Sequence, residues 1–144
     1  MRLKTIVKAI VIDKKGDLLL LRREPNDPNR PGEWDFPGGG IESDEDIAIG
    51  LEREIFEETG LRIDVSSDKL FYAATEFYQA VNATRLMFIV GYSDGEIKLS
   101  HEHDCYKWVD YKTALELFPH RVYSVGLKYA MEHDLLPKND INAS

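Results

Sequence analysis

The hydrophobic pattern near the N-terminus predicts a β-hairpin followed by a long loop. Apolar and polar residues alternate over Thr5–Ile12, and an apolar run returns over Leu18–Arg22. The polar, glycine-containing stretch Asp13–Asp17 separates the two runs and is typical of a hairpin turn. Prolines and asparagines fill Glu24–Gly32, which predicts a loop, and Trp34–Phe36 is short and extended.

The next segment changes from a glycine-rich turn to a helical period. Pro37–Gly40 is expected to be a backbone turn that bulky side chains would not permit. Over Asp44–Thr59 the apolar positions recur four residues apart and form one core-facing stripe: Ile47, Leu51 and Ile55. Either Ser43 or Asp44 caps the start, acidic residues fill the first turn, and Gly60 ends the helix.

The second half of the chain adds strands and then helices. The expected strands are Leu70–Val81, Arg85–Tyr92 and Tyr106–Val109, of which the first two are joined by Asn82–Thr84. The expected helices, separated by Pro119, are Lys112–Leu117 and Val122–Leu135. This order predicts an α/β fold in which a mixed sheet lies between helices on both faces. Residues 1–137 are expected to form one domain, and residues 138–144 a frayed tail.

Composition places the chain among globular proteins. Its 144 residues are 43% hydrophobic and 31% charged, which excludes a disordered or low-complexity chain. The apolar runs are strand-sized, so we expect no membrane span and no signal peptide. Cys105 is the single cysteine and has no internal partner, so we expect a reduced thiol and a cytoplasmic protein.

Negative charge is concentrated in one short stretch. The chain has a net charge of −8, and the 23 residues from Gly39 to Leu61 carry −7 of it. This distribution excludes binding of a nucleic-acid polymer through a diffuse basic surface. Because carboxylates folded into one helix repel each other, something must offset the repulsion, and a divalent cation is the obvious candidate.

Three glutamates share one face of the predicted helix. Glu54, Glu57 and Glu58 stand at positions i, i+3 and i+4, opposite the apolar stripe, and so point away from the core. Their hard oxygen atoms suit Mg²⁺ or Mn²⁺ better than Zn²⁺. Arg53 can reach Glu57 one turn later and hold it. Taken alone, the three glutamates fit a solvated acidic helix face at least as well.

The glycines upstream and the helix together carry a longer pattern. It reads Gly39-x5-Glu45-x7-Arg53-Glu54-Ile55-x-Glu57-Glu58-x-Gly60-Leu61. This resembles the Nudix box at all nine of its specified positions. The resemblance implies a hydrolase that splits a nucleoside diphosphate linked to another group, built on an α/β/α sandwich with a mixed sheet.

The resemblance also implies roles for individual residues. Glu57 and Glu58 look like metal ligands together with the Gly38 carbonyl, and Glu54 looks like a further ligand or the base for the attacking water. Arg53 and Glu45 look like supporting residues. Some members of the family take another glutamate from a loop before a later strand. The residues here that match that placement are Glu102 and, as the fallback, Asp104. The implied cofactor is Mg²⁺, with Mn²⁺ as the alternative.

Substrate contacts are expected from the glycine turn and from two other places. The backbone of the turn, Gly39 included, can serve a phosphate. Arg22 and Arg23 end a strand and point to opposite faces, and Arg23 is the candidate phosphate contact. Tyr78 lies roughly where some dinucleoside polyphosphate hydrolases of the family carry a tyrosine. The aromatic residues that could stack on a base, although packing in the core or at its rim is favoured for each, are Trp34, Phe36, Phe77 and Tyr78.

His101-x-His103-x-Cys105 hints at a soft-metal site, but no further cysteine completes a tetrahedral set. His103 could instead act near a metal-bound water, but a loop histidine is usually solvated, and that is the expectation here.

The expected substrate is a small-molecule nucleotide. The favoured reaction converts a (deoxy)nucleoside triphosphate to a monophosphate and pyrophosphate. Alternatives are an ADP-ribose or dinucleoside polyphosphate hydrolase and a Nudix module that senses nucleotides without turnover. Because dimers occur in the family, a homodimer is also an expectation.

Overall fold

Seven strands and three α-helices make up the part of the chain that the structure describes. This computed structural model describes residues 1–92, 94–118 and 121–137, so Pro119 and the predicted tail 138–144 lie outside it. The strands are β1 (Arg2–Ile12), β2 (Leu18–Arg23), β3 (Trp34–Asp35), β4 (Gly38–Gly40), β5 (Leu70–Tyr78), β6 (Val81–Gly91) and β7 (His103–Val109). The helices are α1 (Ile47–Thr59), α2 (Tyr111–Leu117) and α3 (Arg121–Glu132), with a 3₁₀ turn at Ser67–Lys69.

The strands form one mixed sheet, as predicted. Its central order is β3-β2-β1-β6-β5, with β4 paired to β1 and β7 paired to β2. β1 runs parallel to β6 over its whole length, whereas β1–β2, β2–β7 and β5–β6 are antiparallel. β1 and β2 pair only where Ile12 meets Leu18, at the predicted hairpin turn. Beyond that point the two strands diverge.

The segment from Trp34 to Gly40 crosses between the diverging strands. Its first part, β3, pairs with β2 through Trp34 and Arg22, and its last part, β4, pairs with β1 through Gly38 and Lys8. The expected turn at Pro37–Gly40 is therefore a short strand from residue 38 onward. Gly38 is required there, because it has φ +139 and a Cβ atom on it would overlap the Val7 carbonyl.

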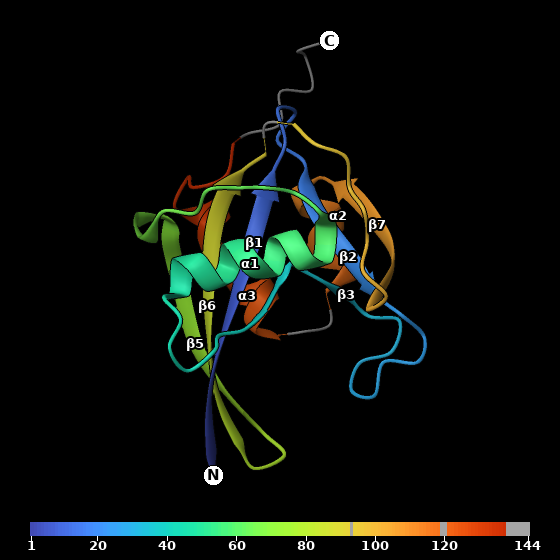
Figure 1. The fold of residues 1–144 in the computed structure, drawn as a ribbon. Coiled ribbons are helices and arrows are strands. Elements are labelled where there is room, and N and C mark those ends of the chain that lie inside the picture. The colour runs from blue at the N-terminus through green and yellow to red at the C-terminus, as the bar shows by residue number, and fades with distance from the viewer. Residues whose placement is uncertain (93, 119–120, 138–144) are drawn as a thin grey trace.

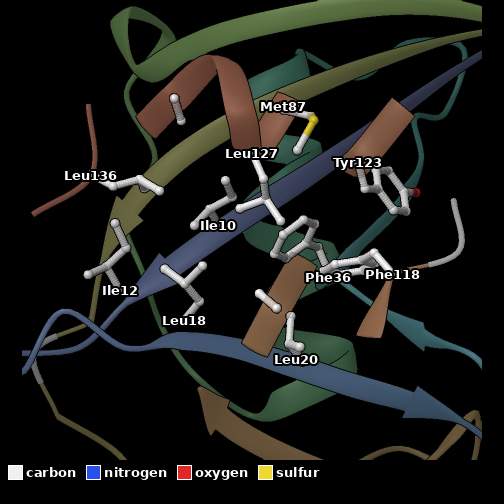
Figure 2. Close-up of a cluster of buried hydrophobic side chains, with 12 residues drawn as sticks. Ile10, Ile12, Leu18, Leu20, Phe36, Met87, Phe118, Tyr123, Leu127 and Leu136 are labelled. Carbon is white, nitrogen blue, oxygen red and sulfur yellow. The ribbon is translucent and has the colours of Figure 1, made fainter. Parts of the chain in front are cut away.

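Alternating residues of the central strands face two separate hydrophobic layers. Val7, Ala9 and Val11 of β1 pack in one cluster with Leu51 and Ile55 of α1. Ile10 and Ile12 pack in the other cluster, on the α2 and α3 side (Figure 2). The members of that second cluster from α2 and α3 are Ala114, Tyr123, Leu127 and Ala130, and Phe118, the C-cap residue of α2, packs with them. The helices thus cover both faces of the sheet, as predicted, with α1 crossing the near face in Figure 1.

Helix α1 begins three residues later than expected. Asp46, rather than Ser43 or Asp44, is the N-cap, and its carboxylate accepts a hydrogen bond from Ala48 N at 3.2 Å. The first turn consequently contains no acidic residue. Gly60 ends the helix with φ 76, as the sequence predicts. Within the described part of the chain, no helix combines the length and the apolar character needed to cross a membrane.

The β5–β6 turn lies earlier than expected. It consists of Gln79 and Ala80, with φ of 44 and 62, as a two-residue hairpin turn of this kind requires. The polar residues Asn82–Thr84, predicted as the turn, instead pair with β1 on one side and β5 on the other. In a strand in the middle of a sheet, the backbone N–H and C=O groups are hydrogen-bonded whatever the side chains are. The local polarity of this segment therefore led to a wrong prediction of the turn.

A buried ion-pair cluster holds the crossing segment in place. The Lys8 ammonium is 3.0 Å from Asp35 Oδ2 and also donates to the carbonyls of Phe36 at 3.2 Å and Gly38 at 3.1 Å. Burial alone would lower the pKa of Lys8, but Asp35 holds it above its ordinary value. Burial would likewise raise the pKa of Asp35, yet Lys8 and two nearby arginines hold it well below its usual range.

Replacing Asp35 tests how much the fold depends on this cluster. We expect Asp35→Asn to lower the free energy of unfolding by about 3 to 5 kcal/mol, since it leaves a buried cation without its counter-ion. Because the pKa of Asp35 is depressed in the folded state, its contribution is present above about pH 4 and is lost as the pH falls. Chemical denaturation at pH 7 is therefore the measurement.

Asp104→Asn is the matched control, because Asp104 pairs with Arg22 at an exposed site. It should change stability much less. Equal losses in the two variants would show that the buried cluster has no special weight.

Candidate active site

A cavity of about 600 Å³ opens beside the crossing segment. Four of the glutamates considered in the sequence line it: Glu54, Glu57, Glu58 and Glu102. The other predicted residues that line it are Arg23, Gly38, Gly39, Phe77 and Tyr78. Arg23 and Glu102, which are 79 positions apart in the sequence, therefore meet at one site.

The three glutamates of α1 differ in their surroundings. The Glu57 side chain is 56% exposed and the Glu54 side chain 16%, whereas Glu58 is 5% exposed as a residue. The expectation that all three point away from the core is wrong for Glu58. α1 packs against β4 and β1, and the Glu58 side chain lies against Gly38 of β4.

Glu58 is held by the glycine strand. The Gly38 N–H donates to Glu58 Oε1 at 2.6 Å, and Lys8 acts on it electrostatically from the same side. Burial nevertheless raises the pKa of Glu58 to about 8. A carboxyl group in this environment gains from a cation that compensates its charge, which is what a metal ligand requires.

Arg53 organises the neighbouring carboxylates. Its guanidinium makes two hydrogen bonds to Glu45, at 2.7 and 2.9 Å, and reaches Glu54 at 3.1 Å and Glu57 at 3.2 Å. It also donates to the Gly40 carbonyl at 3.1 Å. The predicted Arg53–Glu57 contact is present, and the bidentate pair with Glu45 ties the loop before α1 to the helix.

Glu54 lies directly against the glycine strand. A Cβ atom on Gly39 would come within 2.7 to 2.9 Å of the Glu54 carboxylate, so glycine is needed for this approach. Burial raises the pKa of Glu54, while Arg53 opposes that shift. The Gly38 carbonyl, an expected metal ligand, accepts a hydrogen bond from Lys8 at 3.1 Å in this structure.

A potential metal-binding group forms where β7 meets α1. Ligand atoms of Glu58, Glu102 and His103 lie within 4.8 Å of one another. His103, expected to be a solvated loop residue, is buried at the start of β7, and its Nδ1 has no hydrogen-bond partner among the described residues. Burial lowers the pKa of His103 to about 4, so the imidazole is neutral at pH 7. Two carboxylates beside a neutral imidazole fit a divalent cation.

The two arginines that end β2 point to opposite sides, as expected. Arg23 faces the cavity and bonds to Asp27 at 2.8 Å and Asp35 at 2.9 Å. Arg22 forms an ion pair with Asp104 at 2.8 Å. Asp104, the fallback metal ligand, therefore already has a partner at an exposed site.

Of the aromatic candidates for base stacking, Phe36 is fully buried in the core and Trp34 packs beside that cluster. Both therefore follow the core alternative. Phe77 and Tyr78 line the cavity, where Phe77 is 65% exposed and Tyr78 packs against a small buried cluster.

Sequence reasoning missed most of the basic lining. Lys4, Lys8, Arg30 and Arg85 also face this cavity. A lysine inside the apolar alternation of β1 was the available signal for Lys8, because a charged residue is rarely buried unless it is paired. The other three basic residues carry no comparable local signal.

Comparison with known proteins identifies the family of this chain. The family model of the NUDIX domain matches residues 2–126. The chain belongs to the Nudix hydrolase family. A MutT-like protein from Streptomyces ambofaciens is 34% identical over 130 residues, which span 88% of this chain and 75% of the relative. A CTP pyrophosphohydrolase from Escherichia coli K12 is 30% identical over 114 residues, which span 76% of this chain and 78% of the relative.

A solved structure supports the same placement. The MutT protein from Methanosarcina mazei Go1 superposes with a TM-score of 0.82 at 28% identity, covering 92% of this chain and 96% of that one. The Nudix architecture expected from the sequence is therefore confirmed.

Comparing Glu102 with Asp104 tests which acid on this side of the Nudix site binds metal. We expect Glu102→Gln to weaken Mn²⁺ binding by at least the roughly tenfold that losing even an outer-shell partner costs. Asp104→Asn should have little effect, because its carboxylate faces Arg22. Titration of free Mn²⁺ by electron paramagnetic resonance measures both variants. The reverse order of effects would move the ligand to Asp104.

Proposed function

We propose that this Nudix hydrolase is a Mg²⁺-dependent pyrophosphohydrolase that converts a (deoxy)nucleoside triphosphate to a monophosphate and pyrophosphate. The observation that carries the proposal is the convergence of Glu54, Glu57, Glu58 and Glu102 with several basic side chains on one cavity of about 600 Å³. That volume is within the usual range for small-molecule sites. The relative named as a CTP pyrophosphohydrolase supports the same class of substrate.

The metal-binding role falls to Glu57, Glu58 and Glu102. Glu58 and Glu102 already lie within ligand distance of each other, and Glu57 is on the same side of α1. When bound, Mg²⁺ or Mn²⁺ neutralises phosphate oxygens and lowers the pKa of a bound water. The Gly38 N–H donates to Glu58 Oε1 at a distance of 2.6 Å and so fixes this carboxylate. Glu58 can therefore bind a metal ion without changing its conformation.

Glu54 is placed to accept the proton of the attacking water. It is partly buried, its pKa is raised by that burial, and Arg53 fixes its carboxylate at 3.1 Å. The water oxygen bonds to one phosphorus of the α–β anhydride, and the bridging oxygen leaves with the other phosphorus. Arg53 is a positioning residue, while Arg23, the Gly39 backbone and Tyr78 face the cavity where they can contact substrate.

A panel of nucleotides tests the proposed function. With Mg²⁺ present, we expect a nucleoside triphosphate to be the best substrate, with monophosphate and pyrophosphate identified by mass. Glu54→Gln should lower turnover by about 100-fold or more, as expected for loss of a general base. Its affinity for Mn²⁺ should change little, whereas Glu58→Gln should lose both turnover and metal affinity.

Glu52→Gln is the control, because it removes a carboxylate from the same helix at a position that does not line the cavity. Its turnover should match the wild type. Full turnover in excess chelator, or faster cleavage of ADP-ribose or dinucleoside polyphosphates than of any triphosphate, would contradict the proposal. Tight nucleotide binding with no turnover would favour a sensing module instead.

A further inference from the structure

Three basic side chains that line the cavity, Lys8, Arg23 and Arg30, share one oxygen of the buried Asp35 carboxylate. Asp35 Oδ2 accepts hydrogen bonds from Lys8 at 3.0 Å, Arg23 at 2.9 Å and Arg30 at 3.3 Å. The other oxygen, Oδ1, accepts the Phe36 N–H at 2.8 Å. The bond from Arg30 is the longest of these, so Arg30 is the cation that Asp35 satisfies least.

The group of charged side chains around Asp35 carries more positive than negative charge. Asp27 pairs with Arg23 at 2.8 Å, so three cations face two carboxylates. Arg30 Nη1 is buried and has no hydrogen-bond partner among the described residues. Because a buried donor without a partner is costly, an anion that reaches Arg30 would satisfy both its charge and its free donor.

The cationic cluster and the carboxylates belong to the same cavity, which Lys8, Arg23 and Arg30 all line. A single residue, Gly38, joins the two sides: its N–H donates to Glu58 and its carbonyl accepts from Lys8. A phosphate chain held at the carboxylate side is therefore within a few atoms of the cationic side.

We propose that Arg30 is a specificity-determining residue, which binds the phosphate of a triphosphate chain that the metal-binding glutamates do not hold. This inference rests on the proposed function. A planar guanidinium suits that contact, because it can donate two parallel hydrogen bonds to one phosphate. A diphosphate chain held at the carboxylate side has no further phosphate that could reach Arg30. The protein should therefore prefer triphosphates to diphosphates through this residue.

The test uses inorganic tripolyphosphate and pyrophosphate, which need no knowledge of the base. Calorimetry of the wild-type protein with Mg²⁺ should show tighter binding of tripolyphosphate. Arg30→Met should weaken tripolyphosphate binding roughly 10- to 100-fold, the loss of a charge-assisted hydrogen bond, and leave pyrophosphate binding nearly unchanged. Arg30→Lys, which keeps the charge but not the fork, should lose part of the preference.

Arg22→Met is the matched control. It removes the same charge from the end of β2, but Arg22 pairs with Asp104 at an exposed site. It should keep the preference for tripolyphosphate. Asp35 retains Lys8 and Arg23 in Arg30→Met, so thermal unfolding of that variant should stay close to wild type.

Equal weakening of both anions by Arg30→Met and Arg22→Met would overturn the inference, because it would show a general effect of charge. So would a wild-type protein that binds the two anions equally. Failure of the proposed function gives a different result, since no nucleoside triphosphate would then be the best substrate in the nucleotide panel, whatever the anion affinities are.

Discussion

The buried ammonium of Lys8 is the constraint on which the rest of the site depends. It connects the central strand β1 to Asp35 and to the carbonyls of Phe36 and Gly38, and so fixes a segment that crosses between two diverging strands. Fixing Gly38 aims its N–H at Glu58. Since burying a lone ammonium is costly, the interaction persists only because Asp35 compensates the charge. A core ion pair thereby sets the position of Glu58, the buried member of the carboxylate cluster.

Acidic and basic side chains form two separate groups in the lining of this one cavity. Glutamates on α1 and before β7 form one side, and the group around Asp35 carries an excess of positive charge on the other. Arg53 limits the repulsion within the acidic side through its bonds to Glu45, Glu54 and Glu57. A polyphosphate with its divalent cation carries both signs of charge, and such a ligand is complementary to both sides. This explains how a chain with net charge −8 can bind an anionic substrate.

Features defined by local pattern could be predicted from the sequence, and features defined by distant contacts could not. The period of Ile47, Leu51 and Ile55 was sufficient to predict α1, although not its first residue. Glu102, which lines the cavity, was named through the family resemblance and not through a local pattern. The β5–β6 turn was misplaced because Gln79 and Ala80 carry no glycine or asparagine signal. The burial of His103 and the position of Arg30 at the cavity were missed because their environments come from strands and loops far away in the sequence.

The central claim is that the glutamates of this cavity hold divalent cations against a nucleotide's phosphoanhydride. A crystal structure with Mg²⁺ and a triphosphate whose α–β bridge is a methylene group tests it most directly. The account predicts ions lying between the phosphate chain and Glu57, Glu58 and Glu102, with Lys8 still bonded to the Gly38 carbonyl. A phosphate chain bound away from these glutamates, with no ion between them, would contradict it.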